Sequence, residues 1–115
     1  MPIKKHAYLI LAHNNFYNLE KLLKLLDDKR NDIYIHIDKK VKNFPFNYFK
    51  QLCLTAKIYY TRRINVRWGH QSLVLAELTL FNAAYKKGPY HYYHLISGAD
   101  LPLKTQQEIH DFFAD

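Results

Sequence analysis

HAYLILAHNN, residues 6–15, joins a continuous apolar run to an abrupt polar end. Apolar side chains on successive positions are typical of a strand buried on both faces of a parallel sheet. The six apolar residues 7–12 are fewer than the ~7–15 of a secretory signal core and the ~20 of a membrane span. We therefore predict a first buried strand at residues 6–12.

Three further segments have strand-like patterns: DIYIHID at 32–38, KIYY at 57–60 and YHYYHLI at 90–96. Helical periodicity separates them, and the predicted helices cover residues 16–26, 45–52, 70–87 and 105–113. Strands and helices in strict alternation indicate one α/β domain with a Rossmann-like parallel sheet.

Two details of these helices are specific enough to check against a structure. Asn14 or Asn15 is expected to cap the first helix by accepting a hydrogen bond from an early N–H. The segment 70–87 is apolar nearly all round, so we expect it to be buried between layers and to end at Gly88 and Pro89.

In parallel α/β sheets, ligands bind at the carboxyl ends of strands near a switch in strand order. The pattern puts four polar segments at that edge, although each alone is more often an ordinary turn. They are His13-Asn14, Asp38-Lys39, Arg67-Trp68-Gly69 and Ser97 to Asp100.

Composition narrows the classes of function only a little. The 115 residues fit one domain, and the net charge of +7 favours anionic partners. The single cysteine, Cys53, excludes an internal disulfide and is expected to be a buried, inert thiol.

Several familiar sites are missing from the sequence. It contains neither G-x-G-x-x-G nor G-x-x-x-x-G-K-[ST], and no G-x-S-x-G elbow surrounds Ser97. His36 and Asp38 could face one way on a strand, but a metal site needs three or four convergent ligands. No metal site and no cofactor are therefore expected.

One alternative is a surface that binds single-stranded nucleic acid by charge and stacking. It would be built from Arg62, Arg63 and Arg67 with the nearby rings of Tyr59, Tyr60 and Trp68. No RNP, KH or helix-turn-helix pattern accompanies these residues, so we expect no nucleic-acid partner.

Four blocks taken in order resemble one family: AYLILAH, YIHIDKK, VRWGHQSLVLAEL and YHYYHLISGADLPLKTQQEIHDFF. They look like the core-2/I-branching N-acetylglucosaminyltransferases and the related peptide O-xylosyltransferases. The similarity runs from about His6 to Phe113. It implies a GT-A-type fold, a UDP-sugar donor, a glycan or other hydroxyl acceptor, and inverting transfer without a divalent metal.

The resemblance also implies which residues contact the donor. These are Ala12 (or Leu11, since the alignment is loose by one), His13, Asp38, Val66, Arg67, Trp68 and Gly69. Asp38 is expected to recognise uracil or ribose, and Trp68 to wall the nucleotide pocket. Ser97 and Asp100 are expected to shape the sugar pocket or brace its loop.

The chain departs from the family pattern at two points. The family motif W-G-G is here Trp68-Gly69-His70, so its second glycine is lost. The family's catalytic base and diphosphate-binding cations lie in the second half of its domain. We therefore expect residues 1–115 to be the donor-binding half, with the base beyond Asp115.

The remaining expectations concern the activity of the chain and its cellular location. The base cannot be assigned among Asp38, Glu77, Asp100 and Glu108, so the chain alone is expected to bind UDP weakly and to transfer no sugar. A half-domain should also expose apolar surface and self-associate. The alternative is a non-catalytic nucleotide- or sugar-binding module. We expect a cytoplasmic or peripheral membrane location, although eukaryotic relatives are Golgi-anchored.

Overall fold

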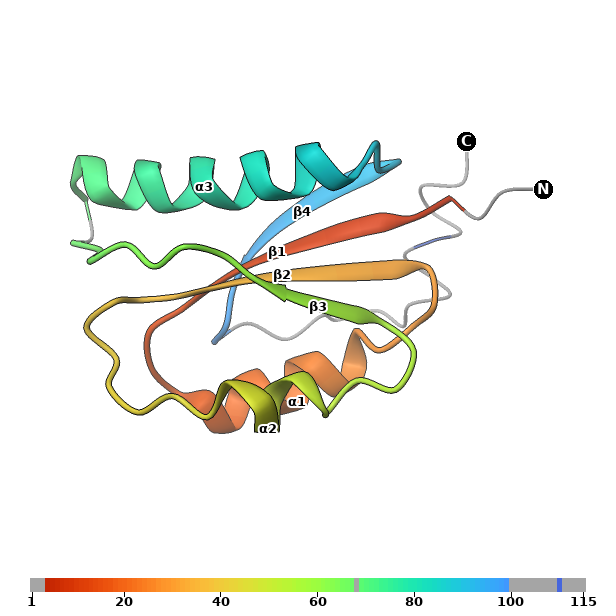
Figure 1. Ribbon diagram of the computed structural model, residues 1–115, viewed down its shortest axis with the longest axis horizontal. Helices are drawn as coiled ribbons and strands as arrows, with labels where there is room; N and C mark the ends of the chain where they lie inside the picture. The colour runs from red at the N-terminus through yellow and green to blue at the C-terminus, as the bar shows by residue number, and fades with distance from the viewer. Residues whose placement is uncertain (1–3, 68, 100–109, 111–115) are drawn as a thin grey trace.

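The computed structural model describes residues 4–67, 69–99 and 110, and within them strands and helices alternate along the chain (Figure 1). The elements are β1 (His6–Ala12), α1 (Phe16–Leu25), β2 (Asn31–Ile37), α2 (Phe46–Lys50), β3 (Lys57–Tyr60), α3 (Gln71–Lys87) and β4 (Tyr92–Ser97). The strand predicted at 90–96 begins two residues later and ends one residue later, at Tyr92–Ser97. Tyr90 precedes the strand, and its hydroxyl donates to Asp32 at 2.6 Å.

The four strands form one parallel sheet in the order β3-β2-β1-β4. β1 lies in the middle, where His6 faces Asn31 on β2 and Tyr92 on β4. All seven residues of β1 are buried, as its unbroken apolar run predicts. The predicted Rossmann-like α/β architecture is confirmed.

Helices cover both faces of the sheet, with α1 and α2 on one side and α3 on the other (Figure 1). Because the strand is pleated, Tyr8, Ile10 and Ala12 of β1 point into the core between the sheet and α1. Ala7, Leu9 and Leu11 point into the core between the sheet and α3. This alternation gives the sheet two apolar cores.

Helix α1 begins differently from the prediction. Asn15 is its N-cap, but it lies in the left-handed region, with φ 51°, and makes no side-chain cap hydrogen bond. Its backbone carbonyl instead accepts from the amides of Asn18 and Leu19. Asn15 is suited to this position because asparagine tolerates left-handed backbone better than most residues.

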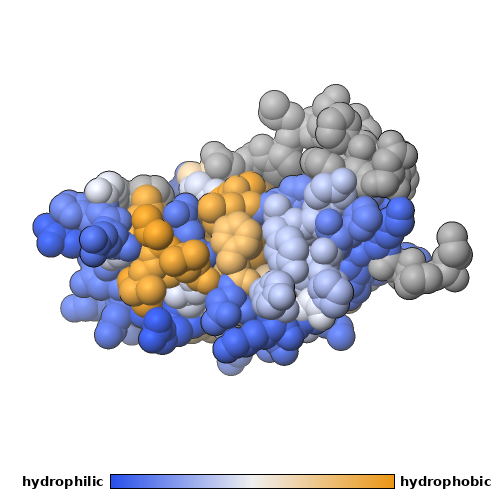
Figure 2. All heavy atoms as spheres, turned by 90° about the horizontal axis from the view of Figure 1, so that it is seen from above, coloured by the Kyte–Doolittle hydropathy of each residue, from blue (hydrophilic) through white to orange (hydrophobic). Residues whose placement is uncertain are grey.

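Helix α3 is not enclosed, contrary to expectation. It buries Ala76, Leu80 and Ala84 against the sheet, but Val74 and Leu78 are more than half exposed. Figure 2, which looks down on the α3 side, shows apolar side chains gathered on this surface. The nearly uniform apolar sequence of α3 therefore did not show that one face of the helix packs on the sheet and the other is exposed.

Three of the predicted features lie outside the described residues: the helix at 105–113, apart from His110, and the side chains of Trp68 and Asp100. Among the residues that are described, no helix has both the length and the apolar character required to cross a membrane.

Candidate functional site

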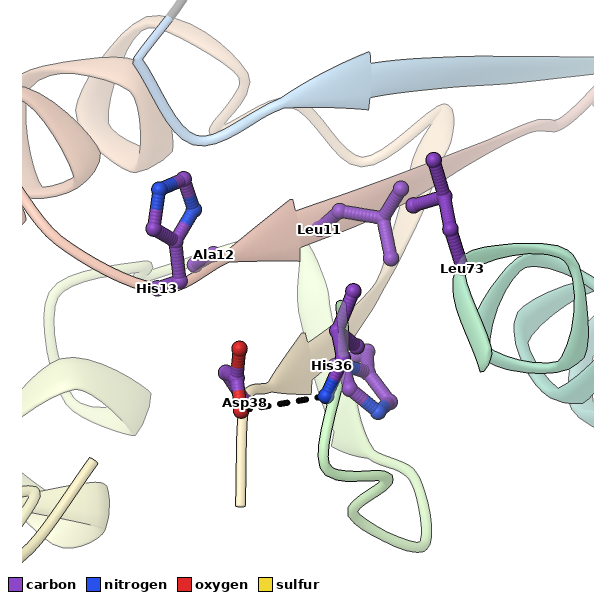
Figure 3. A pocket seen from close by; sticks show the side chains of 7 residues that line it. Leu11, Ala12, His13, His36, Asp38 and Leu73 are labelled. Atoms are coloured by element: carbon purple, nitrogen blue, oxygen red, sulfur yellow. Dashed lines mark hydrogen bonds between the residues drawn. The ribbon is translucent and has the colours of Figure 1, made fainter. Parts of the chain in front are cut away.

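A cleft opens at the carboxyl ends of β1 and β2, and it is built from residues far apart in the sequence (Figure 3). Its inner part is a hollow of about 10 Å³, room for roughly one water molecule. Its outer part is an open space of about 500 Å³. Leu11, Ala12, His13, His36, Asp38, Val66 and Leu73 line the inner part. His13, Asn14, Asn15, Phe16, Asp38, Lys40 and Val41 line the outer part.

Asp38 and His13 border both parts, so they lie at the centre of the cleft. The Asp38 amide donates to the Ala12 carbonyl at 2.9 Å, which ties the end of β2 to the end of β1. The strand ends predicted His13 and Asp38 at one edge, the family resemblance added Ala12, and the structure brings the three together.

Asp38 is 2% exposed, and its carboxylate accepts three hydrogen bonds. Its Oδ1 accepts from the Lys40 amide at 3.0 Å and from the Val66 amide at 3.4 Å, the dashed line in Figure 3. Its Oδ2 accepts from the Lys40 ammonium at 3.0 Å. Lys40 also donates to the Asn65 side chain and to the Val66 carbonyl.

These donors decide the ionisation of Asp38. Burial alone would raise the carboxyl pKa, but the Lys40 amide and ammonium and the Val66 amide outweigh it and leave the pKa below its ordinary value. Asp38 is therefore a fixed negative charge that also positions the loop at Val66.

His36 supports the same loop from beneath. Its Nε2 accepts a hydrogen bond from the Ile64 amide at 2.8 Å, so the proton of the neutral ring is on Nδ1. Burial lowers the His36 pKa, which keeps the ring neutral and able to accept. His36 and Asp38, which were considered together as possible metal ligands, thus each hold the loop at residues 64–66 in place.

Arg63 closes the other side of this region. Its guanidinium donates to the carbonyls of Ile37 at 3.1 Å and Asp38 at 2.9 Å, and also to that of Val41. Tyr60 donates to the Phe46 carbonyl. These side chains hold the protein's own backbone, which weighs against a nucleic-acid surface at this loop.

The loop leading into α3 is shaped by its own backbone bonds. The Arg67 amide donates to the Ser72 hydroxyl at 2.8 Å, and the His70 amide donates to the Arg67 carbonyl. Gly69 has φ +77°, where a side chain would strain the backbone, whereas His70 is extended with φ −117°. The glycine is thus retained where the conformation requires it, and the backbone at His70 does not require glycine.

The Ser97–Gly98 turn approaches the end of β1 from the β4 side. The Gly98 amide donates to the Leu11 carbonyl at 2.8 Å, and a Cβ on Gly98 would lie 3.1 Å from the Ala12 side chain. The Ser97 hydroxyl accepts from the Ala99 amide at 3.2 Å. Ser97 thus braces its loop, and it does not line the cleft.

The site residues predicted from the sequence therefore fall into three groups. Ala12, His13, Asp38 and Val66 line the cleft. Arg67 and Gly69 belong to the loop that follows Val66, and both are exposed. Trp68 and Asp100 are not described. Sequence reasoning did not foresee the roles of Lys40, His36 and Arg63. Apart from Asp38, which pairs with Lys40, their partners lie 22–28 residues away in the chain.

Within the part of the chain that the structure describes, no group of three or more histidine, cysteine, aspartate or glutamate side chains is placed to hold a metal ion. Cys53 is half-buried, and burial raises its pKa to about 12, so its thiol is inert at neutral pH.

Comparison with known proteins finds similarity over almost the whole chain. The family described as "Branch: Core-2/I-Branching enzyme" matches residues 6–115. A human protein, N-acetyllactosaminide beta-1,6-N-acetylglucosaminyl-transferase, is 28% identical over 106 residues. That alignment covers 90% of this chain and 26% of the human protein, so the chain spans about a quarter of the relative's length.

Proposed function

The chain belongs to the Core-2/I-branching enzyme family, and we propose that it forms the donor-binding part of a branching-type glycosyltransferase. In this proposal the donor is a UDP-sugar, and the sugar, GlcNAc or a xylose-like unit, passes with inversion to a hydroxyl of a glycan or similar acceptor. The observation that carries the proposal is the cleft at the ends of β1 and β2, with Asp38 at its centre.

The nucleotide occupies the outer cleft, since the inner hollow of about 10 Å³ is too small for a base. A carboxylate offers about four lone-pair positions, and three donors already bind Asp38. One direction is left to accept from a ribose hydroxyl or a uracil N–H. His13, Ala12 and the backbone from Val66 to Gly69 form the surrounding wall.

Lys40 is the cation best placed for the diphosphate. Its side chain is 55% exposed, yet Asp38, Asn65 and the Val66 carbonyl hold its ammonium group beside the outer cleft, so a diphosphate oxygen would replace one of these three acceptors. A cation held in advance favours the charge of a leaving diphosphate without reorganisation at the moment of reaction. We propose that donor binding needs no divalent metal, and that adding EDTA, Mg²⁺ or Mn²⁺ leaves UDP affinity unchanged.

Titration of the ¹⁵N-labelled chain with UDP tests the location of the site. We expect weak binding, with a dissociation constant on the order of 1 mM, and amide shifts at Ala12, His13, Val66 and Gly69. ADP, which has the same diphosphate, serves as the control for the base. Shifts confined to other surfaces, or equal affinity for ADP and UDP, would contradict the proposed uridine pocket.

Two variants test whether His13 and Lys40 contact the nucleotide or only support the protein around it. His13→Ala removes a side chain at the cleft wall and should weaken UDP binding while the chain stays folded. Lys40→Met removes the proposed diphosphate cation, so it should weaken binding of UDP much more than binding of uridine. A Lys40→Met variant that loses UDP and uridine equally would show that Lys40 only shapes the loop.

We propose further that the 115 residues alone transfer no sugar. A general base works best with a pKa near the operating pH, but the pKa of Asp38, the carboxyl group that borders the cleft, is held below its ordinary value. The test is release of UDP from UDP-GlcNAc in the presence of a glycan acceptor. Turnover by the chain alone, abolished in Asp38→Asn, would make Asp38 the base.

A further inference from the structure

The outer side of α3 carries an apolar stripe at regular spacing. Its members, here called the α3 stripe, are all exposed: Val74 by 53%, Leu78 by 58%, Phe81 by 38% and Tyr85 by 77%. The patch continues onto β4, where Leu95 is 38% exposed and the Tyr93 ring lies 6.2 Å from that of Phe81. Figure 2 looks down on this surface.

The spacing of the α3 stripe identifies the kind of element that fits it. Its four residues are separated by four, three and four positions. This is the spacing with which two helices pack along a common seam, because 3.5 residues per turn keep the apolar side chains facing the partner. Leu75, which is 45% exposed, lies beside the stripe and widens the apolar surface.

We propose that a second copy of this chain covers the α3 stripe, with the two α3 helices antiparallel about a two-fold axis. The interaction does not involve the donor cleft and stands independently of the proposed function. An axis beside Thr79 and Leu80 sets Val74 opposite Tyr85 of the second copy and Leu78 opposite Phe81. Each smaller side chain then meets a larger one, so the stripe is complementary to itself.

Charge favours the antiparallel arrangement. Lys86 and Lys87 form the last turn of α3, and parallel helices would bring the two pairs of lysines together. Antiparallel helices about this axis set Lys86 and its counterpart 13 positions apart along the seam, about 20 Å at 1.5 Å per residue, which exceeds the screening length of about 8 Å at physiological ionic strength. The positions flanking the stripe carry one charged side chain, Glu77.

A seam of four side chains is small, so we expect a weak dimer with a dissociation constant on the order of 10 µM or above. Sedimentation equilibrium over a range of protein concentrations measures it. Leu78→Glu should leave a folded monomer, at least tenfold weaker in association. Leu54→Glu is the matched control, because Leu54 is 89% exposed between α2 and β3, away from the stripe.

Cross-linking tests the orientation in a Cys53→Ser background. A mixture of Val74→Cys and Tyr85→Cys chains should form a disulfide-linked dimer, whereas neither variant should cross-link with itself. Self-linking of Tyr85→Cys would indicate parallel helices and contradict the two-fold arrangement.

Three results would overturn the proposal. They are a monomeric wild-type chain at all concentrations, association equally reduced or equally retained in Leu78→Glu and Leu54→Glu, and a monomer that instead binds vesicles of anionic lipid through the stripe. In the last case a membrane surface, and not a second copy, would be the partner.

Discussion

Asp38 carries a fixed negative charge in the cleft and also holds the loop at Val66. It can do both because it is buried among hydrogen-bond donors. Asp38→Asn keeps the shape but removes the charge that pairs with Lys40. We expect it to lower the free energy of unfolding by about 1–2 kcal/mol at neutral pH. Because the folded-state pKa lies below the ordinary 3.8, this stabilisation is present above that value and is lost as the pH falls through the folded pKa.

Urea unfolding of wild type and Asp38→Asn at neutral and at acidic pH measures both effects. The difference between the two proteins should shrink toward acidic pH. A difference that is independent of pH would mean that packing, and not charge, accounts for the loss.

Two glycines resist substitution for different reasons. Gly98→Val should destabilise the fold by about 2 kcal/mol, because the new Cβ would lie 3.1 Å from Ala12 in the central strand. Gly69→Ala should cost about 1 kcal/mol through its φ of +77° alone, since nothing lies within 4 Å of the added Cβ. Chemical denaturation compares them, and equal stability of Gly98→Val and wild type would contradict the close approach.

The residues of the cleft that the sequence revealed are those whose position along the chain marks a strand end. His13 and Asp38 follow apolar runs, so parallel pairing alone places them at one edge. Ala12 ends the first run and was assigned to the site by the family resemblance. Arg63 could not be interpreted in this way. Its role depends on carbonyl groups of β2 and the turn after it, which no local pattern connects to the residue.

Among the elements, the connection between α2 and β3 shows how one side chain can organise a segment without regular structure. The carboxylate of Asp27 accepts from the amides of Leu54, Thr55 and Ala56 at 2.8–2.9 Å. Burial opposes the charge of Asp27, but these amides and the Thr55 hydroxyl outweigh it and lower the pKa of Asp27.

Asp27→Ala should therefore release the connection while the sheet remains intact. We expect a loss of about 1–3 kcal/mol, since three amides lose their acceptor. Hydrogen exchange should accelerate at Leu54, Thr55 and Ala56 and stay unchanged in β1. Uniform acceleration in both places would mean global destabilisation and would contradict a local role.

Sequence periodicity predicted where the helices and strands lie, but not every detail of how they pack or begin. Periodicity located all seven described elements to within a few residues, because burial imposes periods of two and 3.6 on the chain. It could not tell which side of α3 meets the sheet, since apolar residues occur on both. Nor could it foresee the left-handed Asn15, where backbone conformation replaces the expected side-chain cap.

At the scale of the whole molecule, a histidine cluster joins the segments at the amino end of the sheet. His6 Nδ1 lies 3.0 Å from His94 Nε2, and the His6 ring lies 3.8 Å from that of His110. His110 Nε2 in turn lies 2.9 Å from the Asn31 side-chain oxygen. Burial, followed by the neighbouring His110 and His94, lowers the pKa of His6 from 6.5 to about 3.

The folded protein should consequently lose stability as the pH falls from about 6.5 toward about 3, because in that range the unfolded state binds the proton that buried His6 excludes. The expected slope is about 1 kcal/mol per pH unit. Urea unfolding across this range measures it, and His6→Gln should reduce the slope. An unchanged slope in His6→Gln would assign the acid sensitivity to other groups.

The central position of β1 also bears on the order in which the molecule is assembled. β1 pairs with β2 across a short stretch of chain, from His6 to Asn31, but it meets β4 only at Tyr92. Closing the shorter loop costs less entropy, so β1, β2 and β3 can pair before β4 arrives. His13, Asp38 and Val66 all precede α3. The nascent chain can therefore complete most of the cleft while β4 is still being synthesised.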